Sequence, residues 1–484
     1  MTPEPMIIAA AALLLTGALL SKTSSRFGVP SLLLFMFLGM AAGSEGVLGI
    51  EFEDFELASR IGFIALAFIL FSGGLGTDWT RIRTVLARGA ALATVGVGLS
   101  AGVLGAFAAL ILGFDLVDGL LLGAVIASTD AAAVFSVMRS RGLGVERPLK
   151  PLLELESGSN DPAAVFLTVG IIGLINADGP GVAGLAGVFV LQMGLGILIG
   201  LVAAKGAVWV INTVRLDYDG IYPVMTVAFV LLVFEGTTWL GGSGFLAAYV
   251  AGLTFGNSDV LHKRSLTHFH DAIAWLMQIA MFVVLGLLVF PSDLGPVVLQ
   301  ALAVALVLMF VARPLAVVIT LLPFRVPWRH VGFVSWVGLR GATPIILATL
   351  PVVEEIEGAE TIFNVVFFVV LSSVLIQGSS IPLVARWLGV ASDEDEPRGY
   401  WIEAALAGDS GHDLHEMVVP PGSAADGVAI VGLHLPADSL IVLIQRGGDV
   451  VVPEGRTEIN GGDRLLVMAD DSTLPEVRSI LGVG

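Results

Sequence analysis

Long apolar stretches, separated by short polar connections, follow one another from residue 6 to about residue 388. Each stretch is roughly 15–28 residues long, close to the ~20 residues that an α-helix needs to cross a bilayer. The stretches are rich in Leu, Ala, Gly and Val and lack the short alternating segments typical of a membrane barrel. The pattern predicts an all-α polytopic bundle of about thirteen spans. We place their centres at residues 14, 36, 68, 100, 128, 164, 196, 228, 249, 280, 309, 341 and 374.

Composition supports a membrane protein and excludes an ordinary soluble enzyme. The 484 residues are 56% hydrophobic and only 14% charged, whereas about a quarter of the residues of soluble domains are charged. The first apolar run lacks a basic flank and a small-residue cleavage site, so we expect a retained helix. Most of the net charge of −18 lies after residue 392, which indicates a solvated soluble tail rather than a basic partner such as nucleic acid.

The charges between the spans alternate strictly in sign. By the positive-inside rule the basic connections lie in the cytoplasm, which places the N-terminus outside and the tail inside. We expect the membrane to be the inner or plasma membrane of a prokaryote. The basic set comprises Lys22, Arg26, Arg81, Arg83, Arg139, Arg141, Arg147, Lys150, Arg215, Lys263, Arg264, Arg325 and Arg329. The acidic set comprises Glu45, Glu51, Glu53, Asp54, Glu56, Asp115, Asp118, Asp178, Asp293, Glu354, Glu355, Glu357 and Glu360.

An internal repeat relates the two halves of the apolar region. A shift of 213 residues superposes spans 1–6 on spans 8–13 and carries Asp130 onto Thr343. Six spans plus one linking span make the second copy enter the membrane from the opposite side, and such inverted repeats are typical of secondary transporters. Their substrate sites lie near the midplane, where interrupted helices of the two copies meet. Other matched pairs are Leu33 with Leu246, Gly39 with Gly252, Gly43 with Gly256, Ala67 with Ala280, and Gly73 with Gly286.

Spans 5 and 12 are predicted to be interrupted in mid-membrane. Residues 127–131 read Ala-Ser-Thr-Asp-Ala, and residues 338–344 read Gly-Leu-Arg-Gly-Ala-Thr-Pro. Pro344 has no N–H and Gly341 is flexible, so backbone carbonyls of the preceding turn are freed. Half-helix ends at such breaks present partial charges to an ion. A simple proline kink in span 12 is the alternative.

Span 6 carries three carboxylates in the segment Glu-Leu-Glu-Ser-Gly-Ser-Asn-Asp-Pro at residues 154–162. A carboxylate in hydrocarbon is costly unless it is paired or lines a wet cavity, and it usually marks an ion or proton pathway. Asp161 and Ser157 share one helix face, which supplies the oxygen ligands that a hard monovalent cation needs. A structural carboxylate in a buried network is the alternative. We expect K⁺ or Na⁺ to be held by Asp161, Ser157, Thr129 and Asp130, with Asn160 also at the ion- and proton-binding site.

Glu156 lies on another face of span 6 and needs a cationic partner. The basic side chain at comparable depth beside the other break is Arg340, so we predict an intramembrane Glu156–Arg340 ion pair. Arg313 and Lys205 are expected to be kink or snorkelling residues. Glu154 is interpreted as a residue near the cytoplasmic mouth.

The sequence resembles the NhaP-type antiporters of the monovalent cation/proton antiporter superfamily, closest to the potassium/proton branch. Four segments carry the resemblance: residues 127–136, 154–162, 335–342 and 363–370. It implies a homodimer in which a core bundle with crossed discontinuous helices moves against a scaffold. It also implies that the Asn160-Asp161 pair is that of electroneutral members. Thr343 departs from the hydrophobic residue common in the branch, which affects the expected cation preference.

We therefore expect an electroneutral potassium/proton antiporter that uses alternating access, with both ions competing for Asp161. A sodium or lithium/proton antiporter shares every argument. A ligand-gated potassium channel is an alternative of another class, but the chain lacks a Thr-Val-Gly-Tyr-Gly-like filter. No Ser/His or metal-ligand constellation occurs in the spans, so we expect neither an enzyme nor a resident cofactor.

The tail reads as a separate small α/β domain. We predict an exchanger domain at 1–390, a linker at 391–412 and a cytoplasmic domain at 413–484. Short strands are expected at 415–419, 439–445, 449–452 and 464–468, the middle two forming a hairpin. Residues 418–423, 444–449 and 461–467 resemble the TrkA-C (RCK_C) domain, which implies regulation. The regulator could be a nucleotide or cyclic dinucleotide, and a purely dimer-stabilising tail is the alternative.

Overall fold

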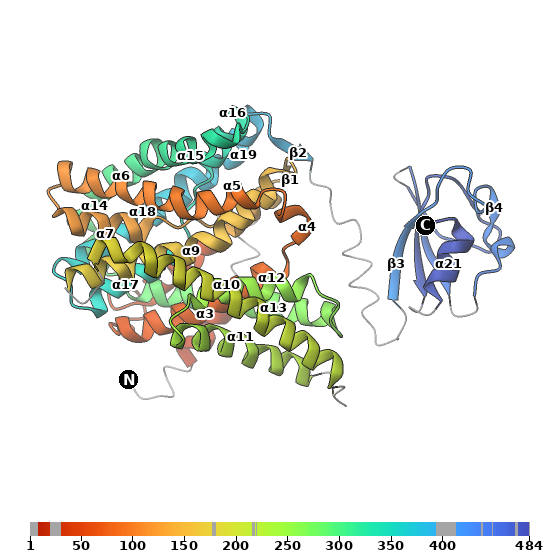
Figure 1. The fold of residues 1–484 in the computed structure, drawn as a ribbon, viewed down its shortest axis with the longest axis horizontal. Helices are drawn as coiled ribbons and strands as arrows, with labels where there is room; N and C mark the ends of the chain where they lie inside the picture. The colour runs from red at the N-terminus through yellow and green to blue at the C-terminus, as the bar shows by residue number, and fades with distance from the viewer. Residues whose placement is uncertain are drawn as a thin grey trace. The chain divides into compact units, whose positions relative to one another are not determined.

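The computed structural model describes residues 8–19, 31–176, 181–214, 218, 220–393, 413–436, 439–447, 449–469 and 473–483. The chain forms two compact units, Met1–Glu394 and Asp395–Gly484. The first unit is a bundle of helices and the second a small domain of strands and one helix (Figure 1). The predicted fold class, a helical membrane bundle with a small α/β domain, is confirmed.

Most helices of the first unit are long and apolar enough to span a membrane. Within the described residues there are eight such helices, a ninth bent pair, and four shorter apolar helices, the first of them at residues 8–19. Each predicted span centre falls in a helix, except 128 and 341, which fall in breaks. The remaining elements are α2 (Ser31–Ala42), α3 (Phe55–Leu75), α4 (Trp79–Ile82), α5 (Leu86–Ala91), η1 (Leu92–Gly96), α6 (Val97–Ile111), α7 (Leu116–Ile126), α8 (Ala131–Ser140), α9 (Leu149–Ile175), α10 (Gly181–Thr213), α11 (Ile221–Trp239), α12 (Gly244–Gly256), α13 (Lys263–Leu287), α14 (Pro291–Val307), η2 (Leu308–Ala312), α15 (Arg313–Leu321), η3 (Leu322–Phe324), α16 (Trp328–Trp336), α17 (Thr343–Val353), α18 (Ala359–Ser373), η4 (Val374–Gly378) and α19 (Ser379–Trp387).

Two helix pairs related by the 213-residue shift pack in the same way, through glycines. Helix α2 packs on α13, where a Cβ added to Gly39 would lie 2.9 Å from the Gly286 Cα. Helix α12 packs on α3, where a Cβ added to Gly252 would lie 2.9 Å from the Phe71 carbonyl carbon. Small residues allow the backbones of membrane helices to approach this closely. Since the shift carries α2 onto α12 and α3 onto α13, the packing agrees with the predicted repeat.

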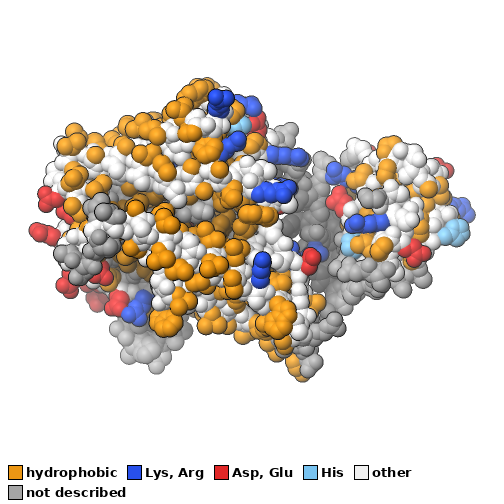
Figure 2. All heavy atoms as spheres, in the orientation of Figure 1, with side chains coloured by type: hydrophobic (Ala, Val, Ile, Leu, Met, Phe, Trp, Pro, Cys, Tyr) orange, Lys and Arg blue, Asp and Glu red, His pale blue; other side chains and the backbone are white. Residues whose placement is uncertain are grey.

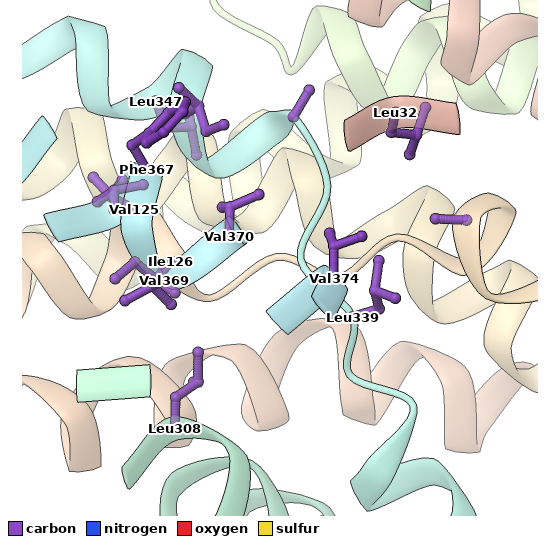
Figure 3. Packing of buried hydrophobic residues seen from close by; sticks show 14 of the residues in the cluster. Leu32, Val125, Ile126, Leu308, Leu339, Leu347, Phe367, Val369, Val370 and Val374 are labelled. Carbon is purple, nitrogen blue, oxygen red and sulfur yellow. The ribbon is translucent and has the colours of Figure 1, made fainter. Parts of the chain in front are cut away.

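A continuous apolar core surrounds the two breaks. At the end of α7, Val125 lies near Leu347 of α17 and Phe367 of α18, and Ile126 lies near Val369 of α18 (Figure 3). All five are fully buried. Leu339, in the second break, is also fully buried in this cluster. The interrupted helices are therefore held inside the bundle rather than facing lipid.

Charged side chains of the helical unit sort to its two ends. In the space-filling view most acidic side chains gather at one end, near α7 and α17, and most basic ones at the other, near α16 and α4 (Figure 2). This sorting agrees with the alternating connections in the sequence. Four of the predicted connection charges, Lys22, Arg26, Asp178 and Arg215, lie outside the described residues.

The second unit contains an antiparallel sheet with strand order β3-β8-β5-β6. The predicted hairpin is confirmed as β5 paired with β6, although Gly448 of its turn lies outside the described residues. A two-stranded pair, β4 with β7, and one helix complete the unit. The elements are β3 (Asp413–Val418), β4 (Val428–Ala429), η5 (Ile430–Leu433), β5 (Leu440–Arg446), β6 (Asp449–Val451), β7 (Glu458–Ile459), β8 (Arg464–Ala469) and α21 (Leu474–Leu481).

One buried carboxylate organises the loops of this domain. The Asp463 carboxylate accepts hydrogen bonds from Arg446 Nε at 2.9 Å and Arg446 Nη2 at 2.7 Å, and another from the Asn460 backbone at 2.8 Å. Asp463 is only 2% exposed. The hydrogen bonds from Arg446 lower the pKa of Asp463 below its ordinary value.

We expect Gly252→Val to destabilise the helical unit, because its side chain would overlap the Phe71 backbone. Overpacking of this kind typically costs about 1–3 kcal/mol. The measurement is the melting temperature and yield of detergent-solubilised protein. Gly236→Val is the matched control, since an added Cβ there meets nothing within 4 Å. Equal melting temperatures for the two variants would contradict the proposed close approach.

We expect the C-terminal unit to lose stability as the pH falls below about 4, near the ordinary Asp pKa. The pKa of Asp463 is lower in the folded state, so its contribution is present above the unfolded pKa and is lost as the pH falls through the folded pKa. Asp463→Asn should cost about 1–3 kcal/mol at neutral pH and flatten this dependence. Urea unfolding of this unit in the full-length protein, followed by methyl NMR at several pH values, measures both. Asp449→Asn, at an exposed position, is the control.

Candidate ion-binding site

The two interrupted spans meet at their breaks. Helices α7 and α8 are bent by 45° at the break formed by residues 127–130. Residues 337–342 separate α16 from α17. The Asp130 amide in the first break donates a hydrogen bond of 2.8 Å to the Leu339 carbonyl in the second. The repeat-related breaks predicted from the sequence are therefore joined directly, backbone to backbone.

Arg340 neutralises the end of α7. Its side chain is fully buried, and Nη1 donates to the Ala127 carbonyl at 2.6 Å and to the Ser128 carbonyl at 2.5 Å. The Arg340 amide donates to the Ser373 hydroxyl at 3.1 Å. A cation at a helix C-terminus compensates the partial negative charge of the free carbonyls, an effect that is large where water is excluded.

Asp130 caps the other half of the interrupted span. It has an extended backbone conformation, and its carboxylate accepts a hydrogen bond of 3.0 Å from the Ala133 amide in the first turn of α8. An anion at a helix N-terminus is stabilised by the free amides and the helix dipole. A Cβ at position 341 would lie 2.8 Å from the Asp130 Cβ, so this close crossing requires Gly341.

Asp161 lies beside both breaks. It is on α9 and is 7% exposed. The Asp130 carboxylate and the hydroxyls of Thr343 and Ser128 lie close to its carboxylate. The structure thus brings the predicted residues Asp161, Asp130 and Thr343 together and adds Ser128. The Ser128 hydroxyl was visible in the polar run of span 5, but the sequence alone did not distinguish it from its neighbours.

Asn160 and Ser157 hold α9 against the first break. The fully buried Asn160 donates from Nδ2 to Thr129 Oγ1 at 2.6 Å. The Ser157 hydroxyl accepts a hydrogen bond of 3.1 Å from the Ala131 amide. Ser157, Asn160 and Thr129 therefore lie at the crossing, where these bonds join α9 to the first break.

The predicted Glu156–Arg340 ion pair is wrong in its partner. Glu156 Oε1 instead lies 2.5 Å from Arg313 Nη1, with side-chain exposures of 1% and 4%, respectively. Arg313 also donates to the Val334 carbonyl at 3.2 Å. Arg340 instead donates from Nη1 to the carbonyls of the first break.

Arg313 was interpreted from the sequence as a kink or snorkelling residue, and the structure corrects this. Its side chain is buried and paired with the buried Glu156, so it does not extend along apolar surface toward water. The π-helical turn η2 directly before Arg313 changes the phase of the helix, and no periodicity in the sequence indicated it.

The groups at this site that could act as ligands of a cation are oxygens of carboxylates, hydroxyls and backbone carbonyls. Among the described residues, no group of three or more His, Cys, Asp or Glu side chains could hold a metal ion. Oxygen ligands of this kind replace the hydration shell of a monovalent cation. The arrangement can therefore hold either a proton on a carboxylate or a cation among several oxygens.

Comparison with known proteins matches both units of the chain. Residues 11–387 match the family described as "Sodium/hydrogen exchanger, transmembrane", and residues 414–482 match the TrkA-C domain. The "K(+)/H(+) antiporter NhaP" of Alkalimonas amylolytica is 38% identical over 476 residues, covering 98% of this chain and 83% of that protein. The "K(+)/H(+) antiporter NhaP2" of Shewanella sp. (strain ANA-3) is 38% identical over 468 residues, covering 96% and 80%.

The fold is also similar to a solved structure, that of the sodium proton antiporter MjNhaP1 from Methanocaldococcus jannaschii. The TM-score is 0.68 at 25% sequence identity, and the match covers 78% of this chain and all of that one.

We expect removal of one partner of the Glu156–Arg313 pair to destabilise the bundle strongly. Arg313→Met leaves a buried, unpaired carboxylate, a loss that typically costs about 3–5 kcal/mol. The double variant Glu156→Met with Arg313→Met should recover part of this loss, because both charges are then absent. Thermal unfolding in detergent of these two variants and of the single variant Glu156→Met measures the coupling.

The control is Arg81→Met, which breaks an exposed pair with Asp78 and should change stability by less than about 1 kcal/mol. A double variant that is as unstable as the sum of its single variants would contradict the assigned partner.

Proposed function

The chain belongs to the sodium/hydrogen exchanger family, and from that premise we propose that it is an electroneutral potassium/proton antiporter that works by alternating access. K⁺ and H⁺ compete for Asp161 in this proposal. The observation that carries it is the position of Asp161, which is nearly buried and lies beside both crossed breaks. An intramembrane carboxylate at such a crossing is where secondary transporters bind their ions.

Competition at a single carboxylate couples the two ion fluxes. When Asp161 is ionised and has no ligand, the change between inward- and outward-facing states is disfavoured, because a bare charge is costly in a low-dielectric interior. Protonated or cation-loaded Asp161 is close to neutral, so each loaded form can pass through the change between inward- and outward-facing states. A ligand shifts such an equilibrium only by its differential affinity for the states.

The neighbouring charges leave Asp161 as the group that exchanges its ligand. Arg340 compensates the α7 carbonyls and Glu156 is paired with Arg313. Asn160 carries no charge and is bonded to Thr129. Since one carboxylate releases one proton for each cation it takes up, the proposed exchange is one for one and electroneutral.

Potassium is the proposed cation because the most similar relatives reported above are named K(+)/H(+) antiporters. The hydroxyl oxygens of Thr343 and Ser128 beside Asp161 are suitable cation ligands, as are those of Thr129 and Ser157 at the same crossing. Sodium or lithium is the second candidate, favoured by the likeness to a sodium proton antiporter.

We place the transporter in a prokaryotic plasma membrane as a homodimer, with the N-terminus outside and the C-terminal unit in the cytoplasm. The separation of acidic and basic ends supports this orientation. In this arrangement residues 1–390 exchange ions, 391–412 link, and 413–484 regulate transport. A nucleotide or cyclic dinucleotide is the proposed regulator, because the unit matches a TrkA-C domain.

Asp161→Asn should abolish cation-dependent proton flux, because the amide cannot exchange a proton for a cation. Wild-type protein in proteoliposomes should dissipate an imposed pH gradient on addition of K⁺. Titration with K⁺, Na⁺ and Li⁺ then gives the selectivity, and we expect the lowest apparent dissociation constant for K⁺. Normal exchange by the variant would refute the assignment of Asp161.

The matched control for this experiment is Glu357→Gln, which makes the same kind of change at an exposed position near α17. It should leave the flux unchanged. Size-exclusion profiles of all three proteins check that the fold is intact.

A further inference from the structure

A short β-ribbon lies where the chain leaves the helical unit. Strand β2 (Ala391–Asp393) pairs antiparallel with β1 (Leu143–Val145), and Gly144 is opposite Ser392. The Glu146 amide extends the ladder by donating a hydrogen bond of 3.0 Å to the Val390 carbonyl. The segment that leads to the C-terminal unit is therefore bonded to a distant loop and not only to the end of α19.

That loop connects the two parts of the ion site. It joins α8, one arm of the first break, to α9, which carries Asp161. Asp161 lies 12 residues into α9 from Leu149, about 18 Å along a continuous helix. Leu143, Val145 and Ala391 pack against the main apolar core, and Val390 is fully buried. A displacement of β1 must therefore move the ends of both helices.

Glu146, directly after β1, connects the same loop to the second break. Its carboxylate lies 2.7 Å from His330 Nε2 and 3.1 Å from Arg329 Nη1, both in the first turn of α16. Arg329 Nη1 also donates to the Gly389 carbonyl at 3.4 Å. Helix α16 leads directly into the break that contains Arg340. The ribbon and Glu146 thus join the tail segment to the helices on both sides of the crossing.

We propose that the β1–β2 ribbon with Glu146 is the site at which the C-terminal unit acts on ion exchange. In this proposal a conformational change in the C-terminal unit displaces β2, and β2 transmits the displacement to α8, α9 and α16 together. The inference rests on the proposed antiport function and adds its route of regulation.

The energetics suit a reversible connection. A two-stranded ribbon with three residues in each strand is marginally stable on its own, so opening it costs little free energy. The pairs of Glu146 are partly exposed, and such pairs contribute about 1 kcal/mol or less. An element with two accessible arrangements is what coupling between separate sites requires.

The ribbon itself can be tested by a disulfide, since the chain has no cysteine. Directly opposed residues in an antiparallel pair have Cα atoms about 4.5–5.5 Å apart, within the range that a disulfide spans. Gly144→Cys with Ser392→Cys should therefore form an intramolecular disulfide on mild oxidation in membranes, whereas each single variant should not. If the double variant does not crosslink, the ribbon is not formed and the proposal is overturned.

The coupling is tested by combining two variants of the full-length chain. Ser392→Pro removes a donor and a favourable conformation from β2. Asp463→Asn loosens the C-terminal unit at a distance along the chain. We expect each to shift the apparent K⁺ affinity in proteoliposomes by roughly fivefold or more, the lower end of typical coupling between sites. Because both interrupt one route, the double variant should shift no further than Ser392→Pro alone.

Additive shifts, or no shift with either single variant, would overturn the proposal. Arg147→Gln changes a charge in the same loop at an exposed position and should leave the affinity unchanged.

A second readout separates this inference from the proposed function. Hydrogen exchange of the full-length protein reports on residues 143–161 whether or not the chain transports K⁺. Ser392→Pro should increase amide hydrogen exchange in the loop and the first turns of α9, but Arg147→Gln should not. If the wild type fails to exchange K⁺ for H⁺, the antiport proposal fails while this comparison still decides the coupling. Unchanged amide hydrogen exchange in α9 of the Ser392→Pro variant would overturn the proposed coupling.

Discussion

Backbone amides and carbonyls that cannot form hydrogen bonds with water impose the central constraint on this structure. A helix that stops inside a membrane leaves amides and carbonyls that must be satisfied by protein. Arg340 satisfies carbonyls at the end of α7, Asp130 caps α8, and the Asp130 amide reaches Leu339 in the opposite break. The two interruptions complete one another, so neither break is stable in this form without the other.

The division of charge around the crossing follows from that constraint. Arg340 and Asp130 carry charges that are committed to helix ends, and Glu156 is committed to Arg313. Asp161 has hydroxyl groups and a second carboxylate as neighbours and is committed to none of the helix ends. A charged group in this position is costly unless it takes a ligand, and that cost is the physical basis of the proposed exchange.

The loop between α8 and α9 links the crossing to one end of the helical unit. It joins the capped half-helix to the helix that carries Asp161, and through β2 it is bonded to the segment that leads to the C-terminal unit. In the proposed route of regulation, the C-terminal unit, which matches a TrkA-C domain, affects the crossing through β2 and this loop. Regulation and ion binding would then share α9.

The sequence by itself determined what local composition and periodicity dictate. The centres of the spans, the positions of the breaks at Asp130 and Gly341, and the repeat all follow from hydropathy and from the residues that interrupt helices. Asp161 was also identifiable, because a carboxylate in an apolar run is costly wherever it lies. The tail hairpin was recognisable from its alternating strands and glycine turn.

Only the tertiary structure decided which charges pair. Glu156 pairs with Arg313 rather than Arg340. A π-helical turn directly precedes Arg313 and sets its rotation, whereas Arg340 Nη1 donates to backbone carbonyls of the other repeat. The β1–β2 pairing joins positions some 250 residues apart, and two three-residue strands carry no pattern of their own. Local patterns report a residue's own cost in the membrane, whereas its partner depends on how distant helices are rotated and offset when they pack.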